Sequence, residues 1–116
     1  MFFKRLQSFR FAFNGIRSFL RSEPNGRIHF VATIAVIIAG IWLHCTQMEW
    51  IVLIIVMAMV WLTEMLNTAI EKIMDHITPE QHPGVKRIKD IAAGAVLIAA
   101  IAAAITGALI FLPKIS

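Results

Sequence analysis

The chain has 116 residues, 59% hydrophobic and only 16% charged, with a formal net charge of +4 and a single cysteine. Average soluble domains have about 45–50% apolar and about 25% charged residues. A domain this small cannot bury such an excess, so a soluble monomer and a disordered chain are nearly excluded. One cysteine excludes a disulfide framework and a cysteine-rich zinc site. A basic balance in so apolar a chain favours a membrane surface over a nucleic acid as partner.

Residues 1–24 are expected to form a basic amphipathic helix. Six lysines and arginines oppose one acid in the first 27 residues, Glu23. Apolar side chains recur at steps of three or four from Phe2 to Leu20. Such a helix is suited to lie in the plane of the lipid headgroups. Arg17 interrupts the apolar run, so the segment does not resemble a signal peptide. Pro24 and Gly26 are expected to separate it from the next element.

Three apolar spans follow, at residues 28–46, 50–71 and 91–112. About 20 helical residues cross a hydrocarbon core roughly 30 Å thick, and lipid leaves no partners for an unpaired backbone, so all three are expected to be transmembrane helices. The second span crosses only if its last turns, including Glu64, lie at the far interface. The sequence therefore predicts an all-α integral membrane protein in one domain, residues 1–116.

The link at residues 72–90 contains Pro79, Pro83 and Gly84, which predicts a helix, a turn and a new helix. Asp90 is expected to cap the third span, where its charge suits the helix dipole. Ten lysines and arginines lie in the N-terminal segment and this link, against one, Lys114, at the other face. The excess places the N-terminus and the link in the cytoplasm.

A polar stripe lies at the end of the second span. Glu64, Asn67, Glu71 and Asp75 recur at helical spacing and share one face. A carboxylate at the bilayer centre costs about 2.5–3.5 kcal/mol on insertion scales. Two readings stay open: interfacial charges that pair with lysines, or a divalent-metal site with a proton acceptor. Two carboxylates one or two turns apart suit the second interpretation, because Mg²⁺ bound to phosphates takes few protein carboxylates.

Two further charges leave similar alternatives. Lys89 is either a salt-bridge partner or a clamp for a transferring phosphoryl group. Glu23 is either a solvated charge or a third carboxylate at the same face. No G-x-x-x-x-G-K-[ST], G-x-G-x-x-G or H-E-x-x-H pattern occurs. Any use of ATP would therefore depend on carboxylate-held Mg²⁺ and basic side chains.

Three separated strings carry a resemblance to a known family. E-M-L-N-T-A-I-E-K-I-M-D at 64–75, H-P-G-V-K-R-I-K-D-I-A-A-G-A-V-L at 82–97 and S-E-P-N-G-R-I-H-F at 22–30 resemble the bacterial diacylglycerol kinase/undecaprenol kinase family. These are small membrane lipid kinases with three transmembrane helices. The resemblance covers essentially the whole chain and implies a homotrimer with active sites shared between subunits, in the bacterial inner membrane.

The resemblance also implies roles for residues. It implies transfer of the γ-phosphate of Mg-ATP to a lipid hydroxyl at the cytoplasmic face, giving phosphatidic acid from diacylglycerol or undecaprenyl phosphate from undecaprenol. Glu64 would be the general base and Asn67 its polar companion, while Glu23 and Glu71 would hold the metal. The residues that it places near the nucleotide are Glu23, Glu71, Glu80, Gln81, His82, Lys89, Asp90, Lys4 and Phe11.

One departure from the family pattern concerns the surface helix. Phe11 stands where relatives often have an aromatic hydroxyl, which removes one possible hydrogen bond. The R-I-H string and the H-P-x-x-K-x-x-K-D loop are more similar to the undecaprenol kinase branch. The competing hypotheses from the residues are a proton- or cation-coupled transporter or channel subunit that uses Glu64, and a non-catalytic scaffold.

Overall fold

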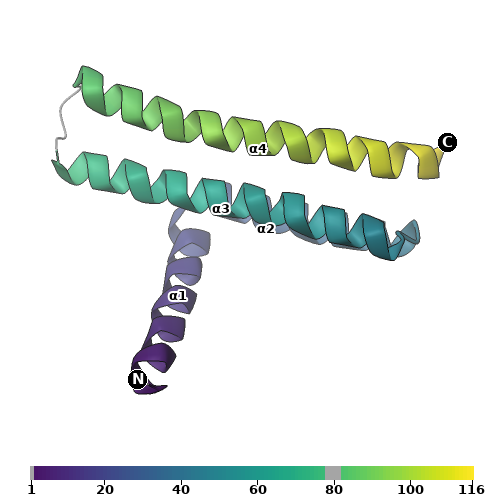
Figure 1. Cartoon of the computed structure of the whole chain (residues 1–116), viewed down its shortest axis with the longest axis horizontal. Coiled ribbons are helices and arrows are strands. Elements are labelled where there is room, and N and C mark those ends of the chain that lie inside the picture. Colours follow the sequence, from purple (N-terminus) through teal and green to yellow (C-terminus); the bar gives the residue numbers. More distant parts are fainter. Residues whose placement is uncertain (1, 78–81) are drawn as a thin grey trace. The chain divides into compact units, whose positions relative to one another are not determined.

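The computed structural model describes residues 2–77 and 82–116, with side chains from Phe3 onward. The secondary structure of this part of the chain consists of four helices: α1 (Phe2–Ser22), α2 (Pro24–Trp42), α3 (Gln47–Ile77) and α4 (Pro83–Ile115) (Figure 1). The last three helices are long and apolar enough to cross a membrane. The predicted all-α fold with three candidate transmembrane helices is therefore confirmed. The placement of α1 on the membrane surface stays a prediction.

The chain divides into two units, residues 1–35 and 36–116. In the first unit, Glu23 alone separates α1 from α2. Its N–H donates to the Phe19 carbonyl at 3.1 Å, and its carbonyl accepts from the Gly26 N–H at 3.1 Å. Pro24 does not separate the elements as expected: it opens α2, a position where its missing N–H costs nothing. The junction therefore carries Glu23 at a fixed place between two helices.

Gly26 is required by the packing of this junction. Phe19 is only 5% exposed. A Cβ atom on Gly26 would lie 2.7 Å from the Phe19 carbonyl oxygen and 3.0 Å from its ring. Only a residue without a Cβ allows the last turn of α1 to approach the first turn of α2 so closely.

In the second unit, a short turn joins α2 to α3. The first span was expected to reach Thr46, but α2 ends at Trp42, and His44 has a positive φ of 56°. Thr46 instead caps α3. Its Oγ1 accepts from the Glu49 N–H at 3.2 Å, and its N–H donates to Glu49 Oε1 at 2.9 Å. This reciprocal pair is a capping box, which fixes the beginning of α3.

α3 and α4 run antiparallel and lie side by side (Figure 1). Leu53 of α3 and Ala92 and Ala99 of α4 are buried, at 2%, 8% and 2% exposure. Small side chains such as these alanines let helices approach closely in a membrane. Most other large apolar side chains of these helices are exposed, as expected for surfaces that face lipid or other chains.

α4 begins eight residues before the predicted span. His82 is its N-cap, with Nδ1 accepting from the Gly84 N–H at 3.0 Å, and Pro83 follows in the first turn. The expectation that Asp90 caps the third span is therefore wrong. Asp90 lies two turns inside α4, where its carboxylate accepts from Lys86 Nζ at 2.6 Å. Residues 86–90 therefore lie inside α4 and do not belong to the link before it.

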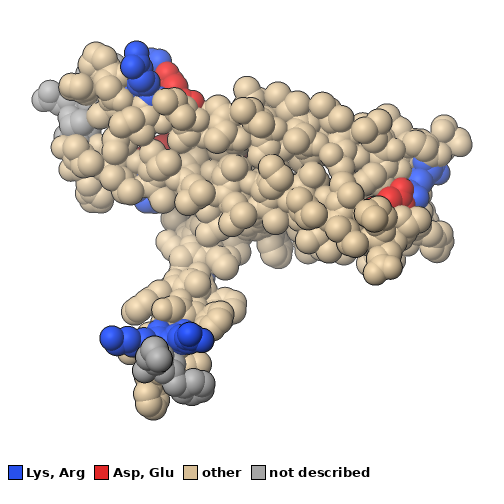
Figure 2. Space-filling model, viewed as in Figure 1, with Lys and Arg blue, Asp and Glu red and all other residues tan. Residues whose placement is uncertain are grey.

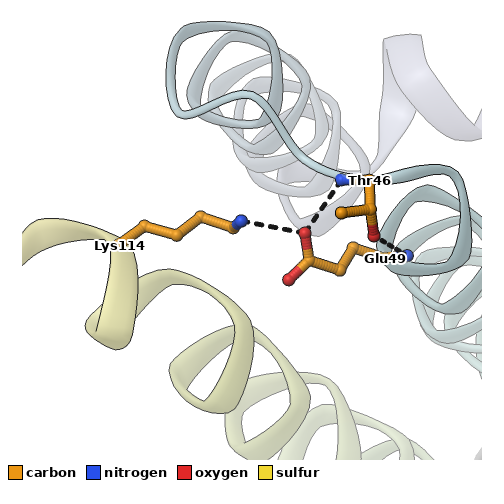
Figure 3. Close-up of polar contacts among 3 residues, drawn as sticks. All are labelled: Thr46, Glu49 and Lys114. Atoms are coloured by element: carbon orange, nitrogen blue, oxygen red, sulfur yellow. Dashed lines mark hydrogen bonds and ion pairs between the residues drawn. The ribbon is translucent and has the colours of Figure 1, made fainter.

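Among the described residues, ion pairs connect α3 to α4 at both ends of the helix pair. Lys89 Nζ donates to Asp75 Oδ1 at 2.7 Å, and Lys114 Nζ donates to Glu49 Oε1 at 2.9 Å (Figure 3). Asp75 and Glu49 are 26 positions apart on α3, which is about 39 Å of helix. That length exceeds a hydrocarbon core of about 30 Å. Figure 2 shows charged side chains near both ends of this helix pair.

Candidate active site

The polar stripe of α3 becomes more exposed toward the end of the helix. Glu64 is 8% exposed and is the one buried polar or charged side chain among residues 3–77 and 82–116. Asn67 is partly buried, whereas Glu71 and Asp75 are exposed. Glu64 is thus the most buried member of the stripe, and Glu71 is accessible to solvent. This gradient suits a site that joins a lipid to a soluble substrate.

Asn67 has an unused buried acceptor. Its Oδ1 atom has no hydrogen-bond partner within the described part of the chain. A buried polar atom without a partner costs about 1–3 kcal/mol, and such exceptions in native proteins call for an explanation. One turn from both Glu64 and Glu71, this oxygen is placed to accept from a ligand or to bind a cation.

At the start of α4 the structure brings predicted site residues into contact with other charges. Lys89 of α4 forms a salt bridge with Asp75 of α3, with 2.7 Å between Nζ and Oδ1. Of the two alternatives for Lys89, the structure therefore shows the salt bridge. Asp90 pairs with Lys86 on its own helix. In this exposed pair, the hydrogen bond from Lys86 to Asp90 raises the pKa of the Lys86 ammonium.

The remaining predicted nucleotide contacts lie in different places. His82 is exposed, and its Nδ1 is used by the α4 cap. Glu80 and Gln81 lie outside the described residues. Lys4 and Phe11 are exposed side chains of α1, with Phe11 at 67% exposure. Glu23, half-buried at the α1–α2 junction, belongs to the first unit with them.

The donor set fits a magnesium ion held by few protein ligands. Among the described residues, no three carboxylate, imidazole or thiol side chains gather closely enough to hold a metal. Mg²⁺ usually keeps several waters and binds one or two carboxylates plus substrate phosphates. The exposed Glu71 carboxylate, one turn from the unused Asn67 Oδ1, offers oxygen ligands of the type that Mg²⁺ prefers.

The cluster at the opposite end of the helix pair was missed. Thr46, Glu49 and Lys114 join the start of α3 to the end of α4 (Figure 3). The backbone N–H of Thr46, and then Lys114, hold the pKa of the Glu49 carboxyl below its usual range. The T-x-x-E pattern predicts the cap. Nothing local in the sequence indicates Lys114, because its contact depends on the register of α3 against α4.

Comparisons with known proteins find relatives that match most of the chain. Residues 10–111 match the family model described as prokaryotic diacylglycerol kinase. The chain is 42% identical to an undecaprenol kinase of Bacillus subtilis, over 98% of this chain and 90% of the relative. It is 40% identical to a diacylglycerol kinase of Synechocystis, over 95% of this chain and 63% of the relative. It is 34% identical to a diacylglycerol kinase of Escherichia coli, over 83% of this chain and 79% of the relative.

Proposed function

The chain belongs to the prokaryotic diacylglycerol kinase family and is a lipid kinase with ATP as phosphate donor, and we propose that undecaprenol is its preferred acceptor. The R-I-H string and the H-P-x-x-K-x-x-K-D string at the start of α4 support this choice. So does the relative named undecaprenol kinase, which matches 98% of the chain. The apolar helices accommodate a polyprenyl or a diacyl tail, so diacylglycerol is the second candidate.

Glu64 is the proposed general base, and its burial is the observation that carries this assignment. The lipid hydroxyl enters laterally from the bilayer and gives its proton to the Glu64 carboxylate. The hydroxyl oxygen bonds to the γ-phosphorus as the bond to the β,γ-bridging oxygen breaks, and ADP leaves. Asn67, one turn away, orients the reacting groups through its free Oδ1.

Glu71 and Glu23 are the proposed holders of Mg²⁺. The ion would neutralise phosphate charge, which is the main requirement of phosphoryl transfer. Lys89 contributes a further positive charge beside the phosphates, and Asp90 belongs to the same nucleotide site. Lys4, Phe11, Glu80, Gln81 and His82 are proposed nucleotide contacts from the surface helix and the link. The excess of lysine and arginine around the link supports a cytoplasmic site, in the bacterial inner membrane.

The proposed assembly is a homotrimer with shared active sites. Apart from Phe19, Leu53, Ala92 and Ala99, the apolar side chains of the described residues are at least partly exposed. With so few buried side chains, a single chain cannot enclose a polar site, so neighbouring copies would supply the missing walls.

The test is ADP release by the detergent-purified protein with Mg-ATP and undecaprenol, diacylglycerol or no lipid. The phosphorylated product is identified by mass. Faster lipid-dependent release with undecaprenol supports the proposed acceptor, whereas faster release with diacylglycerol overturns it. Glu64→Gln keeps the size of the side chain but removes the base, so the rate should fall about 10²–10⁴-fold. A Glu64→Gln variant with more than about a tenth of the wild-type rate contradicts the base assignment.

A further inference from the structure

The two lysines at the start of α4 are held in different ways. Lys86 pairs with Asp90 on its own helix, and both side chains are mostly exposed, at 77% and 63%. Lys89 crosses to α3, where its Nζ lies 2.7 Å from Asp75 Oδ1, and its side chain is only 35% exposed. An interhelical contact fixes a lysine in space more firmly than a contact along its own helix, because it ties the ammonium to a second backbone.

This contact keeps the Lys89 ammonium close to the proposed metal carboxylate. Asp75 follows Glu71 by four residues on α3, which is about 6 Å along the helix. An ammonium has three hydrogen-bond donors, and the structure shows one of them used by Asp75. Two donors remain for phosphate oxygens while the first stays on the carboxylate.

We propose that Asp75 is a positioning residue that holds Lys89 ready to receive the phosphates of ATP. The inference rests on the proposed role of Lys89 at the nucleotide. A free lysine side chain carries about 2 kcal/mol of rotamer entropy, part of which is lost when it binds a phosphate. Since Asp75 has already restricted the Lys89 side chain, nucleotide binding has a smaller entropic cost and the affinity is higher.

Repulsion between Asp75 and the phosphates works against this effect. Asp75 is 65% exposed. Water and salt therefore screen its charge from phosphates that bind Lys89 without touching Asp75. The ammonium stands in direct contact with Asp75 and is half-buried, where the screening is weaker. Ordering of Lys89 therefore outweighs repulsion, and removal of the Asp75 charge should weaken nucleotide use instead of improving it.

The test is the KM for Mg-ATP of Asp75→Asn in the full-length protein, in detergent with saturating lipid. Exposed ion pairs have modest strength, so the KM should rise about two- to fivefold. The kcat and the KM for lipid should stay within about twofold of wild type. The ordering of Lys89 by Asp75 changes the affinity for Mg-ATP, and it changes neither lipid binding nor the chemical step that follows. An unchanged or lowered KM for Mg-ATP overturns the proposal.

The matched control is Glu49→Gln, which breaks the other ion pair between α3 and α4. Glutamine still fits a capping box, so only the charge is lost. If Asp75 merely held the helices together, both variants would lose thermal stability and change the KM for Mg-ATP alike. The proposal requires that Glu49→Gln leave this KM unchanged.

A double-mutant cycle separates this proposal from the assignment of Lys89. Lys89→Met should raise the KM for Mg-ATP, and adding Asp75→Asn to it should have no further effect. A Lys89→Met variant with a normal KM refutes the role of Lys89 and the positioning proposal together. A raised KM in Lys89→Met with a normal KM in Asp75→Asn refutes only the positioning by Asp75.

Asp75→Glu is the conservative variant, and it also serves if Asp75→Asn does not fold. Its longer side chain keeps the charge but displaces the ammonium. Its KM for Mg-ATP should lie between those of wild type and Lys89→Met. A KM at or below the wild-type value would overturn the positioning role.

Discussion

Gly26→Ala should loosen the α1–α2 junction that carries Glu23. The new Cβ would lie 2.7 Å from the Phe19 carbonyl oxygen, closer than side chains approach a backbone oxygen. That oxygen already accepts from the Glu23 N–H, so it cannot turn away without loss of the bond. Overpacking of this kind costs about 1–3 kcal/mol, while alanine gains up to about 1 kcal/mol of helix propensity. We expect a net loss of about 1–2 kcal/mol.

The assay combines stability with metal use. Thermal unfolding in detergent reports the destabilisation, and the dependence of the kinase rate on Mg²⁺ reports the displacement of Glu23, whose proposed role is at the metal. Gly15→Ala is the matched control, because nothing lies within 4 Å of its Cβ position. That variant should be as stable as wild type or more stable. A Gly26→Ala protein with wild-type stability and an unchanged Mg²⁺ requirement would refute the reasoning.

Three further predictions concern α3. Glu71→Gln should raise the Mg-ATP and Mg²⁺ concentrations needed for half-maximal rate, and an unchanged titration would contradict its metal role. Asn67→Leu removes a buried acceptor without a partner, so it should keep or raise thermal stability while the kinase rate collapses; a stability loss above about 1 kcal/mol would argue against this view. The Glu49 carboxyl has a lowered pKa in the folded protein, so its stabilisation is present above its ordinary pKa of 4.5 and is lost as the pH falls through the folded value. Wild type should unfold at a higher temperature than Glu49→Gln at pH 7, and this difference should shrink in acid; a constant difference would contradict the ion-pair origin.

Helix content was predictable because apolar runs of membrane length leave few alternatives to helix. Helix ends were not predictable from those runs, because they are set by polar chemistry outside them. The cap by Thr46 moves the start of α3 to Gln47, three residues before the apolar run. The cap by His82 starts α4 well before Ile91, and this is why Asp90 is an interior residue and not a cap.

For the site, the stripe from Glu64 to Asp75 followed from the helical period alone. The apolar run of the second span predicted apolar surroundings for Glu64, and the structure shows that its side chain is buried. The partner of Lys89 did not follow. Its contact with Asp75 joins residues 14 positions apart across a link, and it depends on how two antiparallel helices are aligned. The sequence could offer only the alternatives of a salt bridge or a phosphate clamp. The structure shows the first, and positioning of Lys89 by Asp75 would make the two roles compatible.

The signs of the two interhelical ion pairs bear on partner choice inside the membrane. α3 supplies the acid at both ends, through Glu49 and Asp75, and α4 supplies the lysine at both ends, through Lys114 and Lys89. In copies that are inserted in the same orientation, two α3 helices would run parallel, so each would bring its acids, Glu49 and Asp75, against the same acids of the other. Two copies of α4 would likewise bring lysines together. Since lipid gives no hydrophobic preference for one apolar helix over another, these terminal charges favour the pairing of α3 with α4 over the pairing of two like helices.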